Sequence, residues 1–158
     1  MVQTLRFRFR DSNSFSQARA IRHRVFVEEQ GVSPELEYEH DEEAHHYLLM
    51  IGEKAIGTAR WRETAKGLKL ERFAILPGLL NRGFGEILLN EVLDDVIPLK
   101  KPVYLHSQAR AVPFYARNGF VQVGEMFVEA GIEHYCMVFR KNWETGSAED
   151  TGNTENTE

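Results

Sequence analysis

Three apolar stretches separated by short turns constrain the fold of this chain more than any other feature of its sequence. The stretches are His46 to Ile51, Ala55 to Trp61 and Leu68 to Leu76, and the turns Gly52-Glu53-Lys54 and Ala65-Lys66-Gly67 lie between them. Parallel neighbours need a crossover of about a dozen residues or more, whereas turns this short are typical of hairpins. The sequence therefore predicts an antiparallel meander of three strands.

Further strands and helices are expected on both sides of the meander. Thr4 to Arg10 alternates apolar and basic residues, which predicts a strand with one buried face. Apolar residues recur at helical spacing from Phe15 to Phe26, and Gly31 and Pro34 then end the predicted amphipathic helix. The other expected elements are a helix after Gly85, a strand at Val103 to His106, a short helix at Ala111 to Asn118, and strands at Phe120 to Phe127 and His134 to Phe139. The order β-α-β-β-β-α-β-α-β-β predicts one mixed α/β domain.

Composition and charge exclude several classes of protein. The chain has 158 residues and is 42% hydrophobic, which suits one globular domain. Its single cysteine, Cys136, excludes an internal disulfide framework and a Cys-rich zinc module and favours a reducing, cytoplasmic setting. Because the longest apolar run is short, we expect neither a signal peptide nor a membrane span, and no metal site is visible.

The negative charge is concentrated at the end of the chain. Residues 144–158 contain five acids and neither lysine nor arginine, so we expect a disordered acidic tail after a domain at residues 1–143. Outside this tail acids and bases are equal in number. A body without a basic excess does not favour binding to nucleic acid.

A glycine-containing turn between a strand and a helix is the first candidate site. The first N–H groups of a helix lack intrahelical partners and lie at the positive end of the helix dipole. Gly83 and Gly85 would let a diphosphate approach this main chain closely, and Arg82 adds a positive charge. A simple flexible entry to the helix is the alternative. The turn lacks the Lys-Ser/Thr pair of a P-loop.

Several motifs together resemble a known family. The run KLERFAILPGLLNRGFGEILL resembles motif A of the GNAT N-acetyltransferase superfamily, whose loop of pattern Q/R-x-x-G-x-G/A binds the pyrophosphate of acetyl-coenzyme A. QARAVPFYARNGF resembles motif B. The runs IRHRVFVEEQGV, HDEEAHHYLL and EAGIEHYCM are similar to the ElaA/YjcF-like branch, and the resemblance covers residues 3–141. Leu80 departs from the pattern, since the family usually has Gln or Arg there, and Gln108 replaces the more usual Asn.

The resemblance implies a fold and a reaction. The fold is a central, twisted, mostly antiparallel sheet flanked by helices, with a parallel pair of strands at the acetyl-CoA cleft. The reaction is transfer of the acetyl group of acetyl-CoA to a primary amine of a small molecule or peptide by direct attack, without a metal. The positions implied to bind acetyl-CoA are Phe73, Ala74, Ile75, Leu76, Asn81, Arg82, Gly83, Phe84, Gly85, Glu86, Gln108 and Phe114.

The resemblance also implies catalytic roles. Tyr115 matches the family's general acid; a tyrosine beside Phe114 in a short helix is often half-buried packing, but the surrounding motif B favours the acid role. A main-chain N–H of the central strand, around Phe73 to Leu76, would stabilise the oxyanion. The candidates for the general base are Glu71, His46, His106 and His134, each of which could instead be structural. Arg72 follows Glu71, and strand alternation places the two side chains on opposite faces.

The identity of the acceptor stays open at this stage. Residues 28–43 carry eight acids and no lysine or arginine, which predicts an exposed acidic loop. Such a loop suits a cationic amine, but a solvated surface is an equal interpretation. Phe26, Tyr38 and Trp61 could line an acceptor pocket or belong to the core. The alternatives for function are a non-catalytic acyl-CoA-binding sensor or partner-binding module, and an acyltransferase like the acyl-homoserine lactone synthases. A homodimer is possible.

Overall fold

Seven strands form one sheet in the order β1-β2-β3-β4-β5-β7-β6. The computed structural model describes residues 1–140, so the expected acidic tail lies outside the described residues. Every neighbouring pair is antiparallel except β4 and β5, which are parallel. The strands are β1 Val2–Arg8, β2 His45–Ile51, β3 Lys54–Thr64, β4 Gly67–Ile75, β5 Val103–Gln108, β6 Phe120–Glu129 and β7 Ile132–Phe139. The predicted meander, β2 to β4, and the mixed α/β class are confirmed.

The helices occupy the predicted places in the chain, with one addition. They are α1 Ser12–Arg22, α2 Pro34–Tyr38, α3 Phe84–Val96 and α4 Val112–Arg117, together with the short 3-10 turns η2 Ile97–Leu99 and η3 Ala109–Ala111. The first predicted helix continues beyond α1 as a π-helix, η1, over His23–Glu29. The addition is α2, which forms inside the acidic run. No helix among residues 1–140 is long and apolar enough to cross a membrane.

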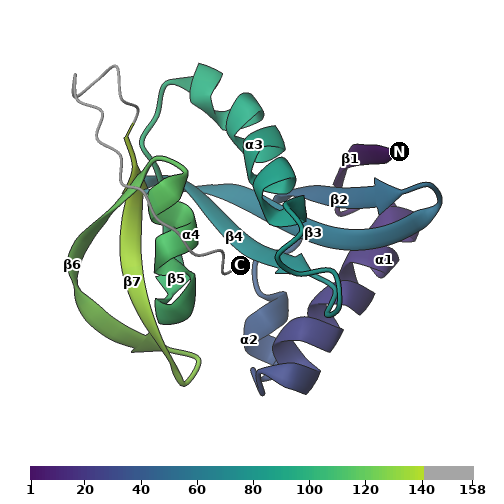
Figure 1. Cartoon of the computed structure of the whole chain (residues 1–158), viewed down its shortest axis with the longest axis horizontal. Helices are drawn as coiled ribbons and strands as arrows, with labels where there is room; N and C mark the ends of the chain where they lie inside the picture. Colours follow the sequence, from purple (N-terminus) through teal and green to yellow (C-terminus); the bar gives the residue numbers. More distant parts are fainter. Residues whose placement is uncertain (141–158) are drawn as a thin grey trace.

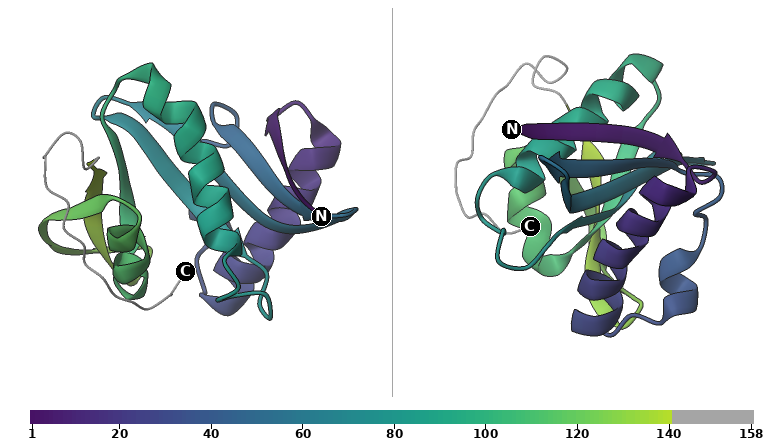
Figure 2. Two further views of the ribbon diagram at one scale, coloured as in Figure 1. Left: turned by 45° about the horizontal axis from the view of Figure 1, so that its top comes forward. Right: turned by 90° about the vertical axis from the view of Figure 1, so that its right-hand side faces the viewer.

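Helices cover both faces of the sheet, and an apolar cluster lies on each face. Leu49 of β2 belongs to the cluster that α3 and α4 complete, whereas its neighbour Leu48 belongs to the cluster beneath α1 and η1. Successive side chains of a strand point to opposite faces, which is why β2 is apolar at every position from Leu48 to Ile51. Figure 1 and the views of Figure 2 place α1 and α3 on opposite sides of the meander.

The sheet divides between β4 and β5. Only Leu68, Lys69 and Leu70 of β4 pair with β5, while β4 stays paired with β3 as far as Ile75. The left view of Figure 2 shows β5, β7 and β6 diverging from the other four strands. The β5-facing edge of β4 is therefore open beyond Leu70.

An irregularity in β4 lies at the start of this open edge. The register with β3 shifts between Thr58 and Arg60, and Arg72 of β4 has a φ of 60°. A positive φ is uncommon for a residue other than glycine, and a β-bulge of this kind re-aims side chains. The expectation that Glu71 and Arg72 face opposite ways is wrong, because both side chains join the charged groups around the acidic run. Arg72 binds Glu37, and Glu71 binds Arg60, which in turn binds an acid of the same run.

The acidic run is not simply an exposed loop. Glu37 is 1% exposed and Asp41 is 6% exposed, and both carboxylates bind the buried guanidinium of Arg22. Asp41 also binds Arg60 of β3. The prediction of an exposed loop is wrong for these two acids, which hold α1, α2 and β3 together. A charge count along the sequence cannot distinguish a paired carboxylate from a solvated one.

Candidate active site

A cavity of about 420 Å³ lies where the sheet divides. η1 and α2 border it on one side, and β5 and the β6–β7 hairpin border it on the other. The predicted site residues that line it are Glu71, Phe73, Ala74, Ile75, Gly85, His106, Gln108, Phe114, Tyr115 and His134. The other predicted site residues are not among its lining residues; they are Leu76, Asn81, Arg82, Gly83, Phe84, Glu86 and His46. A cavity of this size with converging polar groups is typical of a small-molecule site.

Main-chain donors face the cavity along the open edge of β4. The N–H of Leu76 donates to the carbonyl of Ile56 in β3 at 2.9 Å. Because N–H direction alternates along a strand, the N–H groups of Phe73 and Ile75 point away from β3, toward the side that β5 has left. These two positions fall within the segment predicted to supply the oxyanion donor.

The beginning of α3 contributes a second set of main-chain donors. Gly83 precedes α3 with a φ of 85°, a left-handed conformation that glycine adopts without steric cost, and Asn81 has a φ of 63°. The carbonyl of Gly83 accepts the first helical hydrogen bond, from Ile87. The N–H groups of the first helical turn are thus left for an anion. Leu80 lines the cavity beside them, 42% exposed.

Glu71 is enclosed by positive charges. Its carboxylate lies 2.9 Å from Arg60, 3.0 Å from Arg62 and 3.3 Å from Lys69. Burial by itself would raise the pKa of Glu71, but these cations lower it to about 2. A carboxylate held so firmly in its charged form is a poor proton acceptor near neutral pH.

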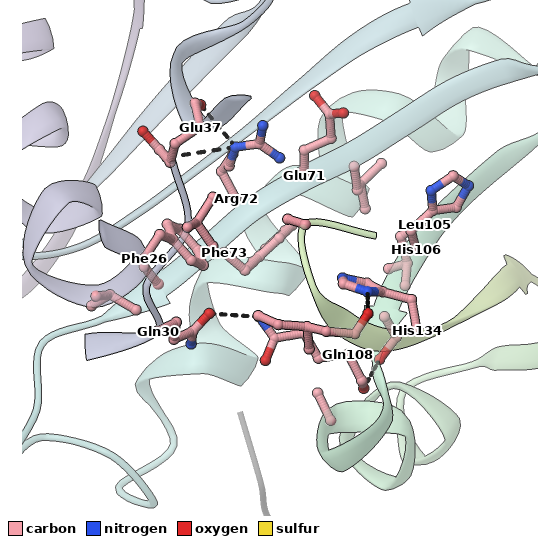
Figure 3. Close-up of a pocket in the computed structure, with 18 of the residues that line it drawn as sticks. Phe26, Gln30, Glu37, Glu71, Arg72, Phe73, Leu105, His106, Gln108 and His134 are labelled. Atoms are coloured by element: carbon pink, nitrogen blue, oxygen red, sulfur yellow. Dashed lines mark hydrogen bonds and ion pairs between the residues drawn. The ribbon is translucent and has the colours of Figure 1, made fainter. Parts of the chain in front are cut away.

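Arg72 ties the open strand to α2. Its Nε donates to the carbonyl of Glu37 at 3.1 Å, and a second guanidinium nitrogen donates to the carbonyl of Leu36 at 3.0 Å. Figure 3 shows this connection between Arg72 and Glu37 at the edge of the pocket. Basic side chains commonly satisfy the last carbonyls of a helix in this way. The bulge in β4 therefore positions α2 over the cavity.

Tyr115 lines the cavity from α4 and is 8% exposed. Its ring makes edge-on contacts with Phe114, with Phe120 and with Phe73 of the open strand. Among the aromatic residues proposed for the acceptor pocket, Phe26 lines the cavity, whereas Trp61 belongs to the core and Tyr38 contacts Arg19. The ring of Tyr115 packs against other aromatic rings, and the residue also borders the cavity. A packing role for the ring is therefore compatible with proton donation by the phenol.

Three of the four candidate bases, Glu71, His106 and His134, line the cavity, and His46 does not. His46 lies outside the cavity, 1% exposed, stacked on Phe7, and its Nε2 donates to the carbonyl of Asp41 at 2.9 Å. Burial lowers the pKa of His46 to about 4. It is therefore placed as a structural residue. His106 and His134 do line the cavity, on its β5 and β7 side, across from Arg72 and Phe26 in Figure 3.

Two contacts in the cavity were not predicted from the sequence. The amide nitrogen of Gln108 donates to the amide oxygen of Gln30 at 2.7 Å, which connects the end of β5 with the end of η1 across the cavity (Figure 3). Nδ1 of His106 lies 3.0 Å from the carboxylate of Glu129. For the contact between His106 and Glu129, the available sequence signal was the position of Glu129 directly before a two-residue turn. Among residues 1–140, no group of three or more potential ligands is arranged to hold a metal ion.

A divided sheet with main-chain donors at the division is the arrangement that the resemblance implied for an acetyl-CoA cleft. The comparisons with known proteins agree with this resemblance. Residues 12–141 match the model of the acetyltransferase (GNAT) domain, and the chain belongs to that family. It is 34% identical over 121 residues to the uncharacterized N-acetyltransferase YjcF of Bacillus subtilis, covering 75% of this chain and 86% of YjcF.

Solved structures of the same fold support the assignment. Escherichia coli ElaA has a TM-score of 0.78 at 22% identity, covering 89% of this chain and all of ElaA. An acyl-CoA N-acyltransferase from Pseudomonas aeruginosa has a TM-score of 0.77 at 23% identity, with 89% and 100% covered. A GNAT family acetyltransferase from Elizabethkingia anophelis with acetyl-CoA bound has a TM-score of 0.63 at 16% identity, with 87% and 94% covered. The expected family, its ElaA/YjcF-like branch and its fold are confirmed.

Proposed function

We propose that this protein transfers the acetyl group of acetyl-CoA directly to a primary amine of a small molecule or peptide. The observation that carries the proposal is the open edge of β4 facing the N-terminus of α3. An elongated acyl-CoA needs an anion site for its diphosphate and a main-chain donor for its thioester oxygen. In this proposal the turn at Gly83 to Gly85 would hold the diphosphate, and the N–H groups of Phe73 and Ile75 would donate to the thioester oxygen.

The bonds and protons balance in the proposed reaction. The neutral amine attacks the thioester carbonyl, a C–N bond forms and the C–S bond breaks. The amine nitrogen gives up one proton to a base, and the leaving thiolate takes one from an acid. Tyr115 is the proposed acid, and the N–H groups of the open strand would stabilise the oxyanion between the two events.

Binding of acetyl-CoA is tested by titration calorimetry on wild type and Gly85→Trp. Gly85 is buried and lines the cavity, so an indole there would obstruct the diphosphate. We expect the affinity to fall at least about tenfold, the change that 1.4 kcal/mol produces. The matched control is Ile87→Trp on the exposed face of the same helix, 39% exposed. Equal affinity in a folded Gly85→Trp protein would contradict the anion site.

Turnover is tested separately by thiol release from acetyl-CoA. The acceptors to screen are simple amines, amino sugars, polyamines and peptides. Thiol release that depends on one class of amine, with an acetylated product seen by mass spectrometry, supports the proposed reaction. Tight binding of acetyl-CoA without turnover on any amine would instead favour a non-catalytic acyl-CoA-binding module.

A further inference from the structure

His106 and Glu129 form a side-chain pair on the wall of the cavity that faces β4. Nδ1 of the imidazole and a carboxylate oxygen are 3.0 Å apart, and both residues line the cavity. His106 comes from β5 and Glu129 from the last position of β6, so 23 positions of sequence separate them. The pair is partly open to solvent, with side-chain exposures of 24% and 41%. It is therefore within reach of a molecule that enters the cavity.

A strained turn fixes the position of Glu129. Glu129 pairs with Ile132 across the β6–β7 hairpin, which leaves Ala130 and Gly131 as the turn. Their φ values are 52° and 76°. Positive φ at both central positions is the signature of a type I′ turn, in which asparagine, aspartate or glycine is usual. An alanine there is strained, and such strain concentrates at functional sites. Ala130 also lines the cavity.

The contact with Glu129 determines which nitrogen of His106 is basic. A carboxylate can only accept a hydrogen bond, so in the neutral imidazole the proton is on Nδ1 and the lone pair is on Nε2. Among residues 1–140, the structure gives Nε2 of His106 no hydrogen-bond partner. The hydrogen bond from His106, followed by the charges of Lys69 and His134, lowers the pKa of Glu129 against the effect of burial. Glu129 is thus held as the carboxylate that this tautomer requires.

We propose that Nε2 of His106 accepts the proton of the acceptor amine and that Glu129 is the positioning residue for His106. This deepens the proposed function and rests on it. As the C–N bond forms, the amine proton moves to Nε2, and the carboxylate stabilises the resulting imidazolium. His106 later returns that proton to water.

Two other groups in the cavity, Glu71 and His134, are less suited to accept the proton of the amine. Glu71 is bound by Arg60, Arg62 and Lys69, and a proton would have to displace those contacts. His134 also has a defined tautomer, because its Nδ1 donates to the carbonyl of Ile132 at 2.7 Å. A neutral carbonyl stabilises an imidazolium less than a carboxylate does.

The first test measures the tautomer and does not depend on any acceptor. Long-range ¹H–¹⁵N NMR spectra of the imidazoles would be recorded at a pH where the rings are neutral, with His106→Gln used to assign the signals of His106. We expect the proton on Nδ1 in wild type and a shift toward Nε2 in Glu129→Ala. Glu133→Gln is the matched control, an exposed glutamate of the same hairpin outside the cavity lining. A wild-type ring protonated mainly on Nε2 overturns the proposal.

The second test measures turnover with the best amine from the screen. We expect His106→Gln to lower kcat by about 10² or more and Glu129→Ala to lower it roughly tenfold, with the KM for acetyl-CoA unchanged. Glu129→Gln should recover part of the loss, because its amide oxygen can still accept from Nδ1. The acidic limb of the pH profile of kcat should shift in Glu129→Ala and stay in place in Glu133→Gln.

The outcomes separate this proposal from the proposed function. Full kcat in His106→Gln, or equal pH profiles in wild type and Glu129→Ala, would overturn the role of the pair. A wild-type protein that acetylates no amine in the screen would contradict the proposed function. In that case the tautomer measurement still decides whether Glu129 orients His106.

Discussion

The Asp41 carboxylate accepts a hydrogen bond of 2.7 Å from Arg60, although 19 positions separate the two residues and both are almost completely buried. The same carboxylate oxygen accepts from Arg22 at 2.8 Å. Arg60 in turn binds Glu71 at the edge of the cavity. A continuous chain of buried charges thus connects α1 and the acidic run with the open strand.

Removing the charge of Asp41 is expected to destabilise the fold. Loss of one partner from a buried ion pair leaves an uncompensated charge, here on both Arg22 and Arg60, and costs about 3 kcal/mol or more. Asp41→Asn should therefore lower the free energy of unfolding, measured by urea denaturation, by about that amount. Glu42→Gln, the exposed neighbour, is the control and should change stability little. Equal stabilities for the two variants would mean that the buried pair contributes nothing net.

The buried His46 predicts a loss of stability on mild acidification. Burial lowers its pKa to about 4, whereas in the unfolded chain the pKa is near 6.5. Between these values the unfolded chain binds a proton that the folded chain does not, so stability falls as pH falls. The full shift corresponds to about 3 kcal/mol.

Urea denaturation between neutral pH and pH ~4.5 checks this expectation. His46→Gln can still donate to the carbonyl of Asp41 but cannot titrate, so its stability should depend less on pH. His23→Gln, at a position whose side chain is 43% exposed, should behave as wild type does. Curves of equal slope for wild type and His46→Gln would show that His46 does not cause the loss. Glu71 contributes below this range, because its stabilisation is lost as pH falls from the pKa of an unfolded glutamate, about 4.3, to its folded pKa of about 2.

The strands and helices were predictable because their signals are local. The alternation from Thr4 and the short turns at Gly52 and Ala65 specify strands and hairpins through spacing alone. The observed β1 nevertheless runs from Val2 to Arg8, two positions earlier than predicted. Periodicity identifies an element better than it identifies its ends.

The contacts inside the cavity were not predictable in the same way. Glu129 and His106 meet only because β6, β7 and β5 are neighbours in the sheet, which is not a local property of the sequence. Arg72 faces the cavity because a bulge interrupts the alternation on which its orientation was predicted. The burial of Glu37 follows from Arg22, which lies 15 positions earlier in the chain. Tertiary pairing decides the contact between His106 and Glu129 and the burial of Glu37, and the backbone irregularity decides the orientation of Arg72.

The exposed acids at the cavity predict a dependence of activity on salt. Glu29 and Glu39 are exposed and line the cavity, unlike the buried Glu37. If they attract a cationic amine, kcat/KM should fall as salt shortens the Debye length below about 10 Å. The double variant Glu29→Gln/Glu39→Gln should start lower and respond less to salt. Glu28→Gln/Glu42→Gln, exposed and outside this cavity lining, is the control. Identical salt dependence in both doubles would leave the acids without a role in substrate attraction.

The role of Tyr115 is decided by removing only its hydroxyl. Tyr115→Phe keeps the ring that contacts Phe114, Phe120 and Phe73, so the fold and the affinity for acetyl-CoA should be retained. If the phenol protonates the leaving thiolate, kcat should fall by roughly 10-fold to 1,000-fold while the KM for acetyl-CoA changes little. The matched control is Tyr135→Phe, a half-buried tyrosine of β7 outside the cavity lining, which should keep full activity. Thiol release and calorimetric titration on both variants provide the measurement. A Tyr115→Phe protein with wild-type kcat would leave the residue with packing alone, and the thiolate would then take its proton from water.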